Sequence, residues 1–169
     1  MPLNLPNILT LLRIAAIPIL VLFAHLGSPW GNWGAAALFG AAALTDLPDG
    51  WLARRSGQTT VFGAFLDPVA DKLIVATALV LLTARFDDVL ITLCACVVIG
   101  REVVVSALRE WMARLGKEAS VAVNQIAKVK TTLQMIAISF LLLLLPEYAT
   151  TGWFILGKTV LIVAVLLTL

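Results

Sequence analysis

Six long apolar runs account for nearly the whole chain, and they restrict its possible folds more than any other feature. Each approaches the roughly 20 residues that a helix needs to cross the hydrocarbon core of a bilayer. The runs lie near residues 8–25, 33–54, 62–84, 88–111, 126–146 and 152–169. Because almost no residues remain for a soluble domain, the sequence predicts a single all-α membrane domain over residues 1–169. We expect a polytopic bundle of six transmembrane helices joined by short loops.

Composition supports the membrane class. Hydrophobic residues make up 61% of the chain and charged residues 13%, and the mean hydropathy is +1.02. A soluble domain is typically about 45–50% apolar and about 25% charged. The sequence therefore predicts an integral membrane protein. The apolar character persists to Leu169, which leaves open whether the native chain extends further.

The positions of lysine and arginine predict the orientation. Arg54 and Arg55 follow the second run, and Arg109, Arg114 and Lys117 follow the fourth. The connections after the first and fifth runs contain neither residue type. Short loops rich in Lys and Arg stay in the cytoplasm, so we expect both termini to be cytoplasmic. The basic rim also suits anionic lipid headgroups or phosphorylated substrates, although the orientation rule alone would produce it.

Four aspartates near the cytoplasmic ends of the second and third runs are the main functional signal. Asp46 and Asp49 share one helical stripe, and Asp67 and Asp71 share another. A carboxylate inside a bilayer is costly and usually functional, and four of them together need a counter-charge. Hard oxygen ligands favour Mg²⁺, Mn²⁺ or Ca²⁺. The sequence therefore predicts that these four aspartates bind divalent metal.

Small residues accompany the aspartates. Gly50, Ala53 and Gly63 lie on the same stripes and leave space beside the carboxylates. That space could admit a flat ligand ring, or a closely packed neighbouring helix of the kind common in membranes.

Charged residues, most of them basic, occur at a similar depth on other runs. Arg13 lies on the first, Arg101 and Glu102 on the fourth, and Lys128 and Lys130 on the fifth. Together they predict a basic pocket that binds a phosphate beside the metal, with Glu102 neutralising an arginine of a neighbouring helix. Snorkelling toward the interface is the alternative explanation for the two lysines.

The spacing of these residues resembles the signature of the CDP-alcohol phosphotransferases, membrane enzymes that join a CDP-linked donor to an alcohol and release CMP. The matching pattern is Asp46-x₂-Asp49-Gly50-x₂-Ala53-Arg54-x₈-Gly63-x₃-Asp67-x₃-Asp71. Residues 5–13 and 60–68 are similar to other segments of the family. Residues 101–109 and 127–134 are similar to the branch whose acceptor is sn-glycerol 3-phosphate.

The resemblance implies a reaction and a set of roles. The phosphatidyl group of CDP-diacylglycerol would be transferred to sn-glycerol 3-phosphate, forming phosphatidylglycerol phosphate and CMP. Two Mg²⁺ or Mn²⁺ ions would be held by the four aspartates, and Asp71 would also be the base that deprotonates the attacking hydroxyl. The residues implied around the CDP moiety are Asn7, Thr10, Asp49, Gly50, Arg54, Thr60 and Gly63. Those implied at the acceptor phosphate are Arg101, Lys128 and Lys130.

The resemblance also implies a homodimer in a bacterial inner membrane, with the active site facing the cytoplasm. Two departures from the family pattern stand out: Pro48 should kink the helix between the first two aspartates, and Ala127 replaces a common glycine. The alternatives are a sister enzyme, such as a cardiolipin, phosphatidylserine or phosphatidylinositol phosphate synthase, and a divalent-cation transporter.

Overall fold

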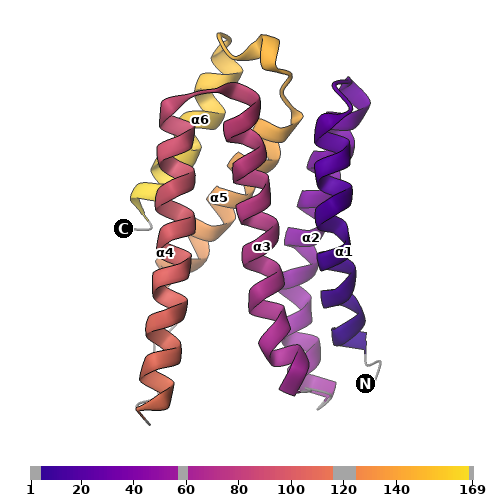
Figure 1. The fold of residues 1–169 in the computed structure, drawn as a ribbon, viewed down its shortest axis with the longest axis vertical. Helices are drawn as coiled ribbons and strands as arrows, with labels where there is room; N and C mark the ends of the chain where they lie inside the picture. Colours follow the sequence, from indigo (N-terminus) through magenta and orange to yellow (C-terminus); the bar gives the residue numbers. More distant parts are fainter. Residues whose placement is uncertain (1–4, 57–60, 116–124, 168–169) are drawn as a thin grey trace.

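The computed structural model describes residues 5–56, 61–115 and 125–167, and these are helical apart from short connections (Figure 1). A one-turn 3₁₀ helix, η1, spans Pro146–Tyr148. Within these ranges there is no strand, and six α-helices occur. They are α1 (Leu5–His25), α2 (Pro29–Ser56), α3 (Val61–Phe86), α4 (Val89–Arg114), α5 (Gln125–Leu143) and α6 (Gly152–Leu166). The all-helical prediction is confirmed, and each expected run corresponds to one helix.

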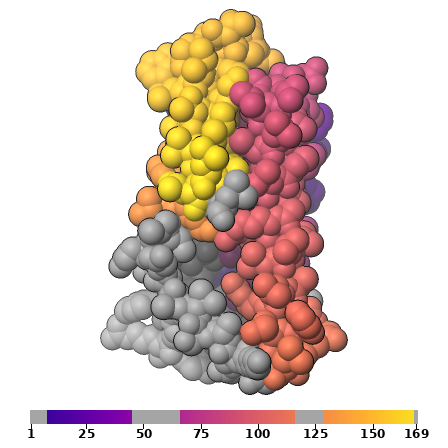
Figure 2. All heavy atoms as spheres, turned by 90° about the vertical axis from the view of Figure 1, so that its left-hand side faces the viewer, coloured from indigo at the N-terminus to yellow at the C-terminus, as the bar shows by residue number. Residues whose placement is uncertain are grey.

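The helices form a bundle in which α1 packs against both α2 and α3. Helix α5 packs against α2 and α6, and α4 packs against α3 and α6. Figure 2 shows α4 and α6 side by side on one face. The fully buried core side chains include Leu20, Phe39, Leu82, Ile138 and Leu161, which come from five of these helices. One continuous apolar core therefore holds the bundle together.

The outside of the bundle is also apolar. Large hydrophobic side chains such as Leu22, Leu93, Val103 and Trp153 are mostly exposed to the surroundings. In the described part of the chain, α1 from Ile8 to His25 and α4 are long and apolar enough to cross a membrane. An apolar exterior over long apolar helices indicates a membrane protein, as the sequence predicted.

Polar side chains connect the helices at the end of the bundle where α1, α3 and α5 terminate (upper end in Figure 1). Arg85 of α3 donates to the carbonyl oxygens of Leu142 at 2.9 Å and Ala24 at 3.1 Å. Lys158 of α6 forms an ion pair with Asp88 at 2.9 Å. Because the last carbonyls of a helix lack intrahelical partners, Arg85 satisfies two helix ends at once.

The aspartate-bearing helix α2 continues as a helix through residue 48 and ends at Ser56. The side chains of residues 45–56 lie outside the described part of the structure. The expected effect of Pro48 on Asp46 and Asp49 therefore stays a prediction.

Candidate active site

The structure describes the side chains of only some predicted site residues. Those it describes are Thr10, Asp67, Asp71, Arg101 and Lys130. The side chains outside the described part are those of Asn7, Asp46, Asp49, Arg54, Thr60 and Lys128, together with positions Gly50 and Gly63. The site residues that the structure describes therefore lie on α1, α3, α4 and α5.

Two polar contacts join α1 to the aspartates of α3. The hydroxyl of Thr10 donates to Asp67, and the Nη1 atom of Arg13 donates to Asp71 in an ion pair. Thr10 and Arg13 are three residues apart and Asp67 and Asp71 are four apart, so each pair lies on one helix face. Thr10 is 2% exposed and Arg13 is 6% exposed, so both polar groups are buried between the helices.

Arg13 explains how Asp71 is accommodated in an apolar bundle. Removing a carboxylate from water costs several kcal/mol unless a counter-charge and hydrogen bonds compensate, and the guanidinium supplies both. The sequence analysis counted Arg13 among the basic residues of a phosphate-binding pocket, whereas the structure pairs it with Asp71. The spacing of three residues between Thr10 and Arg13 shows that both lie on one face of α1. The sequence did not show that this face meets the aspartates of α3.

A cavity of about 650 Å³ opens beside Asp71, between α2, α3, α4 and α5. Apolar side chains including Phe39, Val75, Val98 and Met135 form much of its wall. The polar lining residues are Asp71 and Lys72 on α3, Arg101, Glu102, Ser106 and Arg109 on α4, and Lys130, Thr131 and Gln134 on α5. The structure thus brings three of the predicted site residues, Asp71, Arg101 and Lys130, to one pocket.

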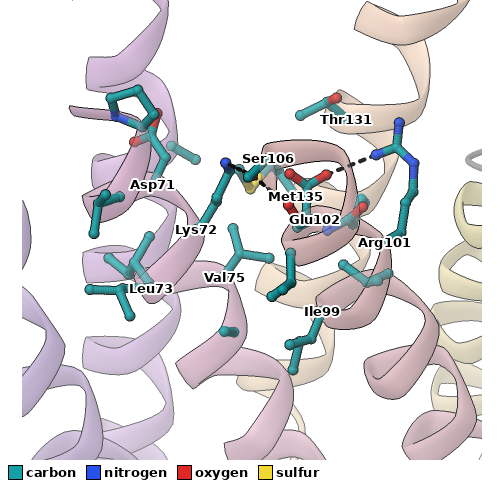
Figure 3. Close-up of a pocket in the computed structure, with 18 of the residues that line it drawn as sticks. Asp71, Lys72, Leu73, Val75, Ile99, Arg101, Glu102, Ser106, Thr131 and Met135 are labelled. Atoms are coloured by element: carbon teal, nitrogen blue, oxygen red, sulfur yellow. Dashed lines mark hydrogen bonds and ion pairs between the residues drawn. The ribbon is translucent and has the colours of Figure 1, made fainter. Parts of the chain in front are cut away.

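Within the pocket, α4 carries an ion pair between neighbouring residues. The Nη1 atom of Arg101 lies 2.8 Å from Oε1 of Glu102, and the charges of both also act on Lys130 of α5. The expectation that Glu102 neutralises an arginine of a neighbouring helix is wrong, because its ion-pair partner is on its own helix. Arg101 and Glu102 can pair because their long, flexible side chains both turn into the pocket (Figure 3).

A second polar connection crosses the pocket from α3 to α4. The Nζ atom of Lys72 donates to the hydroxyl of Ser106, which donates to the backbone oxygen of Glu102 at 2.5 Å. Figure 3 shows Lys72 extending toward Ser106 and Glu102, with Asp71 on one side and Arg101 on the other. Neither Lys72 nor Ser106 was among the predicted site residues, although Lys72 directly follows Asp71 in the sequence.

The described aspartates are suitable donors for a hard cation. Asp67 and Asp71 present carboxylate oxygens one helical turn apart on α3, which is the donor chemistry that Mg²⁺ or Mn²⁺ prefers. Among the described side chains, no group of three or more acidic, histidine or cysteine residues gathers. The other two expected donors, Asp46 and Asp49, lie outside that part.

Comparison with known proteins decides the family. Residues 3–169 match the family model described as CDP-alcohol phosphatidyltransferase. The chain belongs to this family. It is 54% identical over 142 residues to proteins of Escherichia coli K12 and Shigella sonnei, which covers 84% of this chain and 78% of each relative. Both relatives are named CDP-diacylglycerol–glycerol-3-phosphate 3-phosphatidyltransferase.

The match to the CDP-alcohol phosphatidyltransferase family spans every element of the candidate site. It includes α1 with Thr10 and Arg13, the aspartates of α3, and the basic walls on α4 and α5. The resemblance read from the aspartate pattern is therefore confirmed at the level of the family, and the pocket belongs to the matched region.

Proposed function

We propose that the protein transfers the phosphatidyl group of CDP-diacylglycerol to sn-glycerol 3-phosphate, releasing CMP and forming phosphatidylglycerol phosphate. The relatives at 54% identity carry the name of this activity. The observation that carries the proposal is the pocket itself, which has an acidic side chain on α3 and basic side chains on α4 and α5. An acceptor with a hydroxyl at one end and a phosphate at the other requires this distribution of charge.

Asp71 is proposed to remove the proton from the acceptor hydroxyl. The hydroxyl oxygen then attacks the β-phosphorus of CDP-diacylglycerol, the bond from that phosphorus to the CMP oxygen breaks, and CMP leaves. Asp71 lines the pocket, and the ion pair with Arg13 fixes the position of its carboxylate.

Divalent metal is proposed at the four aspartates Asp46, Asp49, Asp67 and Asp71. The family generally uses divalent metal ions, and the oxygen donors of Asp67 and Asp71 fit them. Two ions, Mg²⁺ or Mn²⁺, would neutralise the pyrophosphate and stabilise the attacking and leaving oxygens. Thr10 supports this arrangement through its hydrogen bond to Asp67.

The remaining substrate contacts are assigned by position. Arg101, Lys128 and Lys130 are proposed to bind the acceptor phosphate, and Arg101 and Lys130 line the pocket. Asn7, Thr10, Asp49, Gly50, Arg54, Thr60 and Gly63 are proposed to surround the CDP moiety. In the structure, the Thr10 hydroxyl faces Asp67, so its contact with CDP stays a prediction.

The bundle is proposed to cross the membrane six times, with both termini and the site at the cytoplasmic side of a bacterial inner membrane. Helices α2 and α4 end, and α3 begins, at the same end of the bundle (Figure 1). The aspartates, Arg109 and Arg114 lie near these helix ends in the sequence, which supports this orientation. A homodimer is part of the proposal. The exposed apolar side chains could face either lipid or a partner subunit.

The decisive experiment measures CMP release by the purified protein in detergent–lipid micelles with CDP-diacylglycerol and Mg²⁺. Glycerol 3-phosphate, serine, inositol phosphate and phosphatidylglycerol are compared as acceptors. We expect release only with glycerol 3-phosphate. Asp71→Asn should lower the rate by at least about 100-fold, because a lost general base costs roughly 10²–10⁴-fold.

The other outcomes separate the competing proposals. Release with serine, inositol phosphate or phosphatidylglycerol would keep the chemistry but identify a sister enzyme. An Asp71→Asn variant with the wild-type rate would refute the role of Asp71. Arg114→Met, which changes an exposed residue of α4 outside the pocket, is the control.

A further inference from the structure

The basic residues of the pocket differ from those elsewhere in their partners. Away from the pocket, in the described part of the chain, each lysine and arginine contacts a carboxylate or backbone carbonyls. These contacts are Arg13 with Asp71, Arg114 with Glu110, Lys158 with Asp88, and Arg85 with the carbonyls of Ala24, Leu142 and Leu144. Outside the pocket, the described cations of this bundle therefore have carboxylate or backbone carbonyl oxygens as partners.

In the pocket, cations exceed the carboxylates available to them. Arg101 pairs with Glu102, and Asp71 is already paired with Arg13 from α1. Among the described side chains, no carboxylate lies within ion-pair distance of the other three lining cations, Lys72, Arg109 and Lys130. A cavity with several cations that no carboxylate neutralises is suited to an anionic ligand.

Lys72 is the most informative of the three. It is partly buried, and its ammonium donates to a neutral hydroxyl, that of Ser106. Burying an ammonium without a counter-charge is costly, and a hydroxyl compensates only a part of that cost. Arg109 is exposed and water can solvate it. The environment of Lys72 therefore suits an anion that the described side chains do not supply.

The position of the Lys72 ammonium in the pocket indicates where such an anion would bind. Ser106 uses its own proton for the carbonyl of Glu102, so its oxygen is an acceptor that holds the Lys72 ammonium inside the pocket. In Figure 3, the ammonium lies between Asp71 and the Arg101–Glu102 pair. An acceptor whose hydroxyl is at Asp71 and whose phosphate is directed to Arg101 would pass Lys72.

We propose that Lys72 is a further binding residue for the phosphorylated acceptor, kept in position by Ser106 until the acceptor's phosphate replaces the hydroxyl as its partner. The inference rests on the proposed function, because it takes glycerol 3-phosphate as the ligand. It adds a cation from α3, the helix of Asp71, to the basic residues of α4 and α5. The phosphate would then be held from both sides of the pocket, which fixes the distance from the hydroxyl to Asp71.

The competing explanation is a structural link between α3 and α4. If Lys72 only links the helices, Lys72→Met and Ser106→Ala should lower stability equally and leave acceptor binding unchanged. If Lys72 binds the acceptor, Lys72→Met should impair binding far more than Ser106→Ala, which keeps the ammonium. Lys72→Arg keeps the charge and should restore most of the binding.

The test measures the KM for glycerol 3-phosphate, the KM for CDP-diacylglycerol, and kcat for wild type, Lys72→Met, Lys72→Arg and Ser106→Ala. Binding of glycerol 3-phosphate and of inorganic phosphate is measured in parallel by calorimetry, without donor. We expect Lys72→Met to weaken acceptor binding by about tenfold or more, as the loss of a charged hydrogen bond implies. The KM for CDP-diacylglycerol should not change. Thr159→Ala controls for Ser106→Ala, because Thr159 makes the same type of bond to a carbonyl four residues earlier, away from the pocket.

Two results overturn the inference or separate it from the proposed function. A Lys72→Met protein that is folded and binds glycerol 3-phosphate like wild type overturns it. If wild type binds inorganic phosphate in a Lys72-dependent way but releases no CMP with glycerol 3-phosphate, the phosphate site stands and the proposed acceptor is wrong.

Discussion

At the scale of single residues, the partly buried ion pair between Arg13 and Asp71 connects stability to the proposed chemistry. Asp71 lines the pocket, and Arg13 is a buried cation on another helix that neutralises it. A chain that places a carboxylate among apolar helices must compensate its charge before any ligand arrives. Arg13 does so here, and it orients the carboxylate toward α1 while Asp71 still lines the cavity.

Arg13→Met should therefore destabilise the protein by about 3 kcal/mol, because it leaves a partly buried carboxylate without its counter-charge. The measurement is the free energy of unfolding in micelles that contain a chelator, so that divalent metal cannot replace the guanidinium. Arg114→Met is the matched control, since its pair with Glu110 is exposed and contributes less than about 1 kcal/mol. Equal losses in the two variants would contradict this account of Arg13.

At the scale of elements, close approach of the helices depends on particular glycines. A Cβ atom at Gly31, in the first turn of α2, would lie 2.5 Å from the backbone oxygen of Phe23 at the end of α1. That oxygen cannot move without shifting α1. A Cβ atom at Gly100 on α4 would meet nothing within 4 Å. The two glycines are both helical, but only the first is required by packing.

Gly31→Ala should lower the free energy of unfolding by about 1–3 kcal/mol, as overpacking does. Gly100→Ala should leave stability unchanged or raise it by up to about 1 kcal/mol, because alanine favours the helix more than glycine does. Thermal or denaturant unfolding in the same micelles compares them. A Gly31→Ala protein as stable as Gly100→Ala would show that the end of α1 adjusts freely.

At the scale of the whole molecule, the two ends of the bundle have different roles. One end is closed by Arg85 and by the ion pair of Lys158 with Asp88. The opposite half contains the aspartates of α3 and the pocket cations. These contacts join the helices at the end away from the pocket, while the half proposed to bind substrate contains a cavity.

The orientation of these ends can be tested by labelling single cysteines. In a background without Cys94 and Cys96, Arg114→Cys should react with a membrane-impermeant thiol reagent only after cells are permeabilised, whereas Ser28→Cys should react in intact cells. The reason is that Lys and Arg keep the connection after α4 in the cytoplasm. The reverse labelling pattern would show that the proposed orientation is wrong, and labelling of both sites in intact cells would contradict the six-span arrangement.

The sequence by itself determined the helices and the family, and it predicts the residues that carry the chemistry. Apolar runs of helical length predict α1 to α6 because burial in lipid or protein core requires them, and the spacing of the aspartates places Asp67 and Asp71 on one face of α3. Such local periodicity shows which residues share a face. It does not show which helix that face meets.

Only the tertiary structure decided the partners. It paired Arg13 with Asp71, paired Glu102 with Arg101 of the same helix, and hydrogen-bonded Lys72 to Ser106. The first and third contacts depend on how two helices are rotated against each other, and all three depend on where a long, flexible side chain finds an oxygen. These properties arise from the packing of the whole bundle, and no pattern within a single helix determines them.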